Sequence, residues 1–153
     1  MIYFGQEVGE PGAENAGFGS ATRTSIFDYV GVPTFQRWVN KHSFDGGQST
    51  DNEKELRDFY KRLLNFTLNS DALMGKFKEI QTINRNETKA YDPGMYSYVR
   101  WTAKEKLIVV VNFSWVTTSH FDLKVPADVI KTWNINDGLY DVTDQLYGSK
   151  AQL

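Results

Sequence analysis

The stretch Leu107-Ile-Val-Val-Val-Asn-Phe113 decides how the second half of this chain is interpreted. Consecutive aliphatic residues rich in β-branched side chains are typical of a strand at the centre of a sheet, covered on both faces. Residues 95–101, rich in Tyr and Val, precede this stretch and read as a second strand. The polar link at residues 102–106 predicts a hairpin between them. The sequence therefore predicts an antiparallel sheet here.

More strands are expected towards the C-terminus. Residues 121–125 alternate between apolar and polar side chains, and Pro126-Ala127-Asp128 reads as a turn after them. Residues 129–135 and 139–142 then supply two strands joined by a tight turn at Asn136-Asp137-Gly138, because Asp-Gly favours a short hairpin. Strands that follow one another from residue 76 without a helical pattern predict an antiparallel β-sandwich.

The first half of the chain is organised differently. Residues 2–4 form a short apolar run that ends at Gly5, which predicts a buried strand that delivers Gln6 and Glu7 at its C-terminal end. Eight of the twelve glycines fall within residues 5–50, which predicts a long loop. Inside that loop, Pro33 is suited to begin a short helix.

A longer helix is predicted next. Thr50 and Glu53 have the spacing of a capping box, in which each side chain binds a backbone N–H near the other residue. Apolar residues then recur at helical spacing from Leu56 to Leu64, and charged residues occupy the other side. We expect the apolar face of this helix to be buried.

Composition bounds the functional class. The chain has 153 residues, 24% of them charged, with a formal net charge of −2, so it lacks the basic field that attracts nucleic acid or an anionic membrane surface. No apolar run approaches the roughly 20 residues that span a bilayer. The chain has no cysteine, and His42 and His120 stand apart from any ligand cluster, so we expect no metal site and no cofactor. The sequence does not indicate a cellular compartment.

Five segments appear in an order that resembles one known family. They are Ile2-Tyr-Phe-Gly-Gln-Glu-Val-Gly-Glu10, Ala21-Thr-Arg-Thr-Ser-Ile-Phe-Asp-Tyr29, Leu56-Arg-Asp-Phe-Tyr-Lys-Arg-Leu-Leu64, Leu73-Met-Gly-Lys-Phe77 and Lys106-Leu-Ile-Val-Val-Val-Asn-Phe-Ser114. Together they resemble the C-terminal part of the α-amylase family of glycoside hydrolases (family 13).

The resemblance implies an α+β fragment with two parts. Residues 1–73 would be the C-terminal end of a (β/α)8 barrel, consisting of its eighth strand, a long loop and its eighth helix. Residues 74–153 would be the all-β domain that follows the barrel, an antiparallel β-sandwich cut short at its C-terminus. We therefore expect exposed apolar faces and open sheet edges to make the chain self-associate.

The resemblance also implies a function without a catalytic residue. In the family, the catalytic carboxylates follow the fourth, fifth and seventh strands of the barrel, which would all lie upstream of Met1. The chain is then the non-catalytic C-terminal portion of a hydrolase of carbohydrate metabolism, with an α-glucan or maltooligosaccharide as partner of the parent enzyme. An autonomous carbohydrate-binding or structural β-domain is the alternative.

The candidate substrate-binding residues lie near the predicted barrel rim. Glu7 follows the first strand, Arg23 and Asp28 can bind sugar hydroxyls, and Tyr29 can stack on a pyranose. For Arg23 and Asp28, we favour an internal ion pair that stabilises the loop over a contact with sugar. Glu10 and Glu14 share an irregular loop with Glu7, which cannot preorganise a catalytic pair. Three tryptophans near the predicted strands serve either core packing, which we favour, or a sugar platform: Trp101, Trp115 and Trp133.

Overall fold

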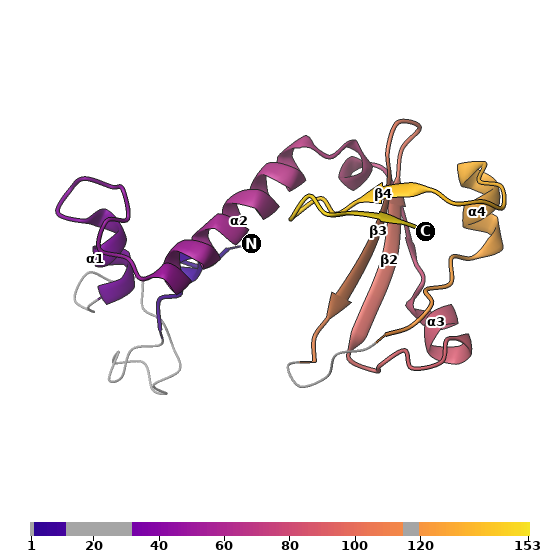
Figure 1. The fold of residues 1–153 in the computed structure, drawn as a ribbon, viewed down its shortest axis with the longest axis horizontal. Coiled ribbons are helices and arrows are strands. Elements are labelled where there is room, and N and C mark those ends of the chain that lie inside the picture. Colours follow the sequence, from indigo (N-terminus) through magenta and orange to yellow (C-terminus); the bar gives the residue numbers. More distant parts are fainter. Residues whose placement is uncertain (1, 12–31, 115–119) are drawn as a thin grey trace. The chain divides into compact units, whose positions relative to one another are not determined.

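The computed structural model describes residues 2–11, 32–114 and 120–153 and divides the chain into two compact units (Figure 1). The first unit is Met1–Phe66 and the second is Thr67–Leu153. Helices and antiparallel strands are both present, so the predicted α+β class is confirmed. The described residues form no barrel, and the barrel fragment stays a prediction.

Three helical elements make up the described part of the first unit. The 3-10 helix η1 covers Gln6–Val8, α1 covers Pro33–Val39 and α2 covers Asp51–Asn69, so α2 ends just past the division between the units. The helix predicted after Thr50 is confirmed together with its capping box. Thr50 N donates to Glu53 Oε2 at 3.1 Å, and Glu53 N donates to Thr50 Oγ1 at 3.4 Å.

Two expectations for this unit are wrong. Residues 2–4 form no strand, because the chain turns at Gly5, whose φ of 74° lets Glu10 N donate to Gly5 O at 2.9 Å. A side chain at Gly5 would bring its Cβ within 2.7 Å of Glu10 Cβ. The apolar face of α2 is not buried either: none of its residues is fully covered, and Leu64 is 51% exposed.

The second unit is built on a three-stranded antiparallel sheet. Strand β1 covers Lys76–Glu79, β2 covers Met95–Trp101 and β3 covers Lys106–Asn112, in the order β1-β2-β3. The predicted hairpin between β2 and β3 is confirmed, with Trp101 opposite Lys106. Among the described residues the aliphatic run forms an edge strand rather than the central one, because β2 takes the central place between β1 and β3.

Two helices of this unit were not predicted. One lies where a strand was expected at residues 129–135, and the other lies where no helix was expected. Helix α3 covers Gln81–Glu87 and α4 covers Ala127–Trp133, and both lie on the same side of the sheet (Figure 1). The core forms where they meet β2, from Ile80, Val99, Val129 and Trp133. Val129 and Trp133 are four residues apart, a helical spacing that their strong strand preference masked. This unit is therefore not all β, and helices rather than a second sheet pack on the core face.

The C-terminal strands also differ from expectation. Residues 121–125 form no strand, and no hairpin forms at Asn136-Asp137-Gly138. Instead β4, Asp141–Thr143, pairs with β5, Lys150–Gln152, as a separate two-stranded sheet. The turn between them is held by Asp144 N donating to Ser149 O at 2.8 Å. The short 3-10 helix η2, Asp71–Met74, precedes β1.

Candidate functional site

Aromatic side chains form a continuous row on the sheet face opposite the core. Residues that pair across strands share a face, so Tyr96 and Tyr98 of β2 lie on the face that also carries Val109 and Val111 of β3. Phe77 of β1 joins them, with its ring centroid 5.5 Å from that of Tyr98, and Tyr98 is 5.8 Å from Tyr96. We call Phe77, Tyr98 and Tyr96 the aromatic row.

The row presents rings to the surface at a regular spacing. Phe77 is 53% exposed and the two tyrosines are half-buried. Neighbouring ring planes are tilted by 41° and 46°, so the row turns from one ring to the next. Aromatic faces offer apolar area with a negative quadrupole, to which the C–H groups of a sugar ring can pack, and the tyrosine hydroxyls can bind sugar hydroxyls. Chemically, the row suits a non-planar oligosaccharide better than a flat one.

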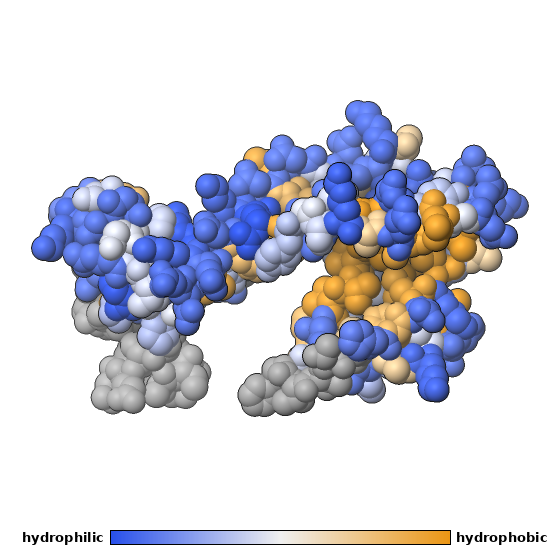
Figure 2. All heavy atoms as spheres, in the orientation of Figure 1, coloured by the Kyte–Doolittle hydropathy of each residue, from blue (hydrophilic) through white to orange (hydrophobic). Residues whose placement is uncertain are grey.

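The sequence carries only part of the signal for this row. Tyr96 and Tyr98 are two residues apart, which is the spacing that places side chains on one face of a strand. Phe77 comes from a strand 19 residues earlier, and only the β1–β2 register brings it beside Tyr98. A single aromatic alternation does not reveal whether its face is covered. Figure 2 shows hydrophobic residues gathered over the region of β2 and β3.

The substrate-binding residues expected near a barrel rim are only partly placed. Glu7 lies in η1, half-buried, and not at the end of a strand. Arg23, Asp28 and Tyr29 lie outside the described residues. The structure therefore does not bring the four together, and their roles stay predictions.

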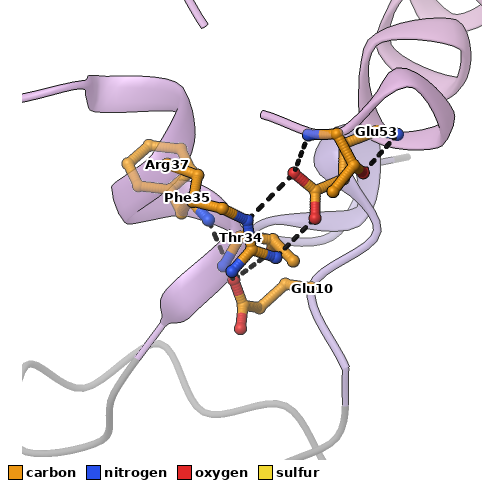
Figure 3. Close-up of polar contacts among 6 residues, drawn as sticks. Glu10, Thr34, Phe35, Arg37 and Glu53 are labelled. Carbon is orange, nitrogen blue, oxygen red and sulfur yellow. Dashed lines mark hydrogen bonds and ion pairs between the residues drawn. The ribbon is translucent and has the colours of Figure 1, made fainter. Parts of the chain in front are cut away.

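Glu10 has a clear structural role instead of a catalytic one. Its Oε2 atom accepts hydrogen bonds from Thr34 N and Phe35 N, each at 3.0 Å, and from the Thr34 hydroxyl (Figure 3). These two N–H groups belong to the first turn of α1, where no side chain of the neighbouring Val32 caps the helix. A carboxylate there satisfies open donors and complements the helix dipole. Glu10 thus caps α1 from 24 residues away.

Two side-chain contacts join α1 to α2. Arg37 forms an ion pair with Glu53, the same residue that closes the capping box of α2 (Figure 3). One turn further along α2, the Arg57 guanidinium lies 3.8 Å from the centroid of the Trp38 ring. The hydrogen bond from Arg37 is the main cause that lowers the pKa of Glu53 below its ordinary value of 4.5. Glu53 therefore has a structural role in the first unit.

The tryptophans of the second unit are core residues where the structure describes them. Trp133 is 7% exposed, and Trp101 packs against it edge to face with centroids 6.1 Å apart. This confirms the preference for core packing over a sugar platform at these two positions. Trp115 lies outside the described residues.

A polar depression of about 400 Å³ lies between the end of α3 and the segment that follows residue 119. Its lining includes Glu87, His120, Asp122 and Lys124. Lys124 Nζ lies 3.1 Å from the Glu87 carboxylate, so two of the charged side chains that line the depression form an ion pair with each other. Within the described ranges, no three acidic or histidine side chains come together as metal ligands, and no helix is long and apolar enough to cross a membrane.

Comparisons of the chain with protein families, with curated proteins and with solved structures give no match.

Proposed function

We propose that this chain is the C-terminal portion of an α-amylase-type glycoside hydrolase acting on α-glucans, and that it is not catalytic by itself. The observation that carries the proposal is the order of the five family-like segments along the sequence. The succession of a glycine-rich stretch of sequence, a long amphipathic helix and a unit built on an antiparallel sheet is consistent with it. Glu10 caps α1 and Glu53 forms an ion pair with Arg37, and these structural roles support a chain without catalytic carboxylates.

Under this proposal the first unit contributes contacts to substrate but no chemistry. Glu7 is the one described candidate among the four predicted sugar-binding residues, since Arg23, Asp28 and Tyr29 lie outside the described residues. Retaining hydrolysis needs two carboxyl groups about 5 to 5.5 Å apart across the scissile bond. The parent enzyme would supply that pair from another part of its barrel.

Two measurements test the proposal. The reading frame upstream of the codon for Met1 is expected to encode alternating strands and helices, with an Asn-His-Asp-type segment one helix away. The purified 153-residue chain is expected to release no reducing sugar from starch or maltooligosaccharides. Turnover above that of a heat-killed sample, or an upstream frame without such a pattern, would overturn it.

The aromatic row favours a second candidate, an autonomous carbohydrate-binding domain. Binding by stacking needs neighbouring exposed rings on a rigid support, and the row stands on paired strands. The tilt between the rings favours a helical α-glucan over a flat β-linked chain. This candidate needs no barrel, so it does not depend on what precedes the chain.

Affinity electrophoresis tests whether the aromatic row is the binding surface, as the second candidate requires. In gels that contain soluble starch the chain is expected to be retarded, and in gels with hydroxyethylcellulose it is not. Tyr98→Ala should abolish most of the retardation because Tyr98 touches both other rings of the row. Tyr147→Ala, at a tyrosine that is 66% exposed and outside the row, is the matched control. Equal retardation of both variants would rule out the row as the binding surface.

A further inference from the structure

Strand β3 presents an open edge of defined geometry. Thr102 N donates to Glu105 O and Phe113 N donates to Gly94 O, both at 2.9 Å, which marks these as hydrogen-bonded pairs of the β2–β3 ladder. Such pairs alternate along an antiparallel ladder. The backbone groups of Leu107, Val109 and Val111 therefore point towards β2. Those of Ile108 and Val110 point the other way, where the described residues contribute no further strand.

Between Lys106 at its start and Asn112 at its end, this edge carries none of the usual protection against another strand. Residues 107–111 contain no charge, proline or glycine, and all five are aliphatic. Natural edge strands normally carry lysine, proline or a bulge that prevents pairing. Val110 is 44% exposed, and Ile108, Val109 and Val111 are half-buried. The edge combines strong strand propensity with open backbone groups.

We propose that β3 pairs in antiparallel fashion with β3 of a second copy of this chain, about a two-fold axis at Val109. In this register Ile108 faces Val110 of the partner subunit as a hydrogen-bonded pair, and Leu107 faces the partner's Val111. Val109 faces the partner's Val109. Two three-stranded sheets then join into one sheet of six strands.

The sequence of β3 favours a second copy over a foreign strand because it complements itself. With the axis at Val109, every aliphatic residue from 107 to 111 meets another aliphatic residue. Lys106 meets the partner's Asn112, so no like charges face each other. With the axis moved to Ile108, Lys106 would face the partner's Val110. With the axis moved to Val110, Ile108 would face the partner's Asn112. Both alternatives place a polar side chain against an aliphatic one.

The pairing also has a consequence for the exposed face. Val109 and Val111 share the face of the aromatic row, and a two-fold axis perpendicular to the sheet keeps the same faces of both copies on one side. The two rows would flank a central strip formed by Leu107, Val109 and Val111 of both copies. This inference stands on the edge geometry alone and does not depend on the proposed function.

Disulfide trapping tests the register, since the chain has no cysteine of its own. Val109 would form a non-hydrogen-bonded pair with its symmetry mate, with Cα atoms about 4.5 Å apart, within the range that a disulfide can bridge. Under mild oxidation, Val109→Cys is expected to form a covalent dimer at least ten times faster than Val111→Cys, which would face Leu107 of the partner subunit. Equal rates for the two variants would overturn the register.

Sedimentation velocity tests the association itself. The full chain is expected to form dimers at micromolar concentration, and Val110→Lys should raise the dissociation constant at least tenfold. Leu139→Lys introduces the same charge at a side chain that is 77% exposed and outside β3, so it should leave the dimer intact. Val110→Pro gives a second disruption, because its missing N–H points away from β2. A monomer at all concentrations, or a dimer that Val110→Lys and Val110→Pro leave unchanged while both retain the native circular dichroism, would overturn the proposal.

Discussion

The side-chain amide of Asn84 holds both backbone groups of Lys124. Asn84 Nδ2 donates to Lys124 O at 2.9 Å, and Lys124 N donates to Asn84 Oδ1 at 2.8 Å. The amide thereby gives Lys124 the two backbone hydrogen bonds that a neighbouring strand would otherwise supply at this residue. Asn84 is completely buried, and its Nδ2 also donates to Ile80 O at 2.7 Å. One side chain thus ties α3 to the segment that leads into α4.

Replacing Asn84 should destabilise the second unit strongly. Asn84→Ala leaves the part-buried N–H and C=O of Lys124 without these partners, and an unpaired polar group costs about 1–3 kcal/mol when it is fully buried and less when water reaches it. We expect the free energy of unfolding in urea to fall by about 1–3 kcal/mol. Asn86→Ala, at an exposed position of the same helix, should change it by less than about 0.5 kcal/mol. A similar loss in both variants would contradict the role of the amide.

Glu10 should stabilise α1 through its N-terminal cap. Glu10→Ala removes the acceptor for Thr34 N and Phe35 N, and the loss of a helix cap costs about 0.5–2 kcal/mol. Glu10→Gln keeps one acceptor but loses the charge, so an intermediate loss is expected. Hydrogen exchange of the α1 amides in increasing urea measures the effect in the first unit, because fluorescence would also report the other three tryptophans. Glu55→Gln, an exposed acidic residue of α2, serves as the control and should be nearly neutral.

The Arg37–Glu53 pair should make the first unit sensitive to acid. Because folding lowers the pKa of Glu53 below 4.5, the stability that its carboxylate contributes is complete above that pH. It is lost as the pH falls from 4.5 through the lower pKa of the folded state. The urea midpoint reported by hydrogen exchange of the α1 and α2 amides should therefore drop more steeply on acidification in the wild type than in Glu53→Gln.

A control separates the acid sensitivity due to Glu53 from that due to Asp45. Hydrogen bonds from Asn40 and from the backbone of Gly47 lower the pKa of Asp45, so this residue also contributes stability that is lost in acid. Asp45→Asn should keep the part of the acid response that belongs to Glu53. If Glu53→Gln followed the wild-type curve while Asp45→Asn flattened it, the ion pair would not be the cause.

The indole of Trp133 should contribute through its volume rather than its N–H group. Trp133 packs edge to face on Trp101, and its buried Nε1 has no hydrogen-bond partner among the described residues. Trp133→Phe keeps most of the packing and removes that donor, so a loss below about 1.5 kcal/mol is expected. Trp133→Ala should cost about 3–5 kcal/mol because it leaves a cavity. Near-equal losses in thermal unfolding would show that the N–H group matters.

Local signals determined several elements from the sequence alone. The capping box of Thr50 and Glu53 marks the start of α2 because its two hydrogen bonds form within one turn of backbone. Pro33 marks the start of α1 because its ring presets the helical φ angle. The hairpin between β2 and β3 follows from two apolar runs around a short polar link. Each of these features depends on residues that are neighbours along the chain.

Only the tertiary structure decided which element lies beside which. The aliphatic run of β3 reads as a central strand, yet β1 pairs with the other side of β2 and leaves β3 at the edge. Val129 and Trp133 favour strands locally, but burying both against Val99 requires the helical spacing of α4. Glu10 caps a helix 24 residues away, and the β1–β2 register joins Phe77 to Tyr98. These outcomes depend on burial and pairing between segments far apart in sequence, and such contacts leave no local pattern.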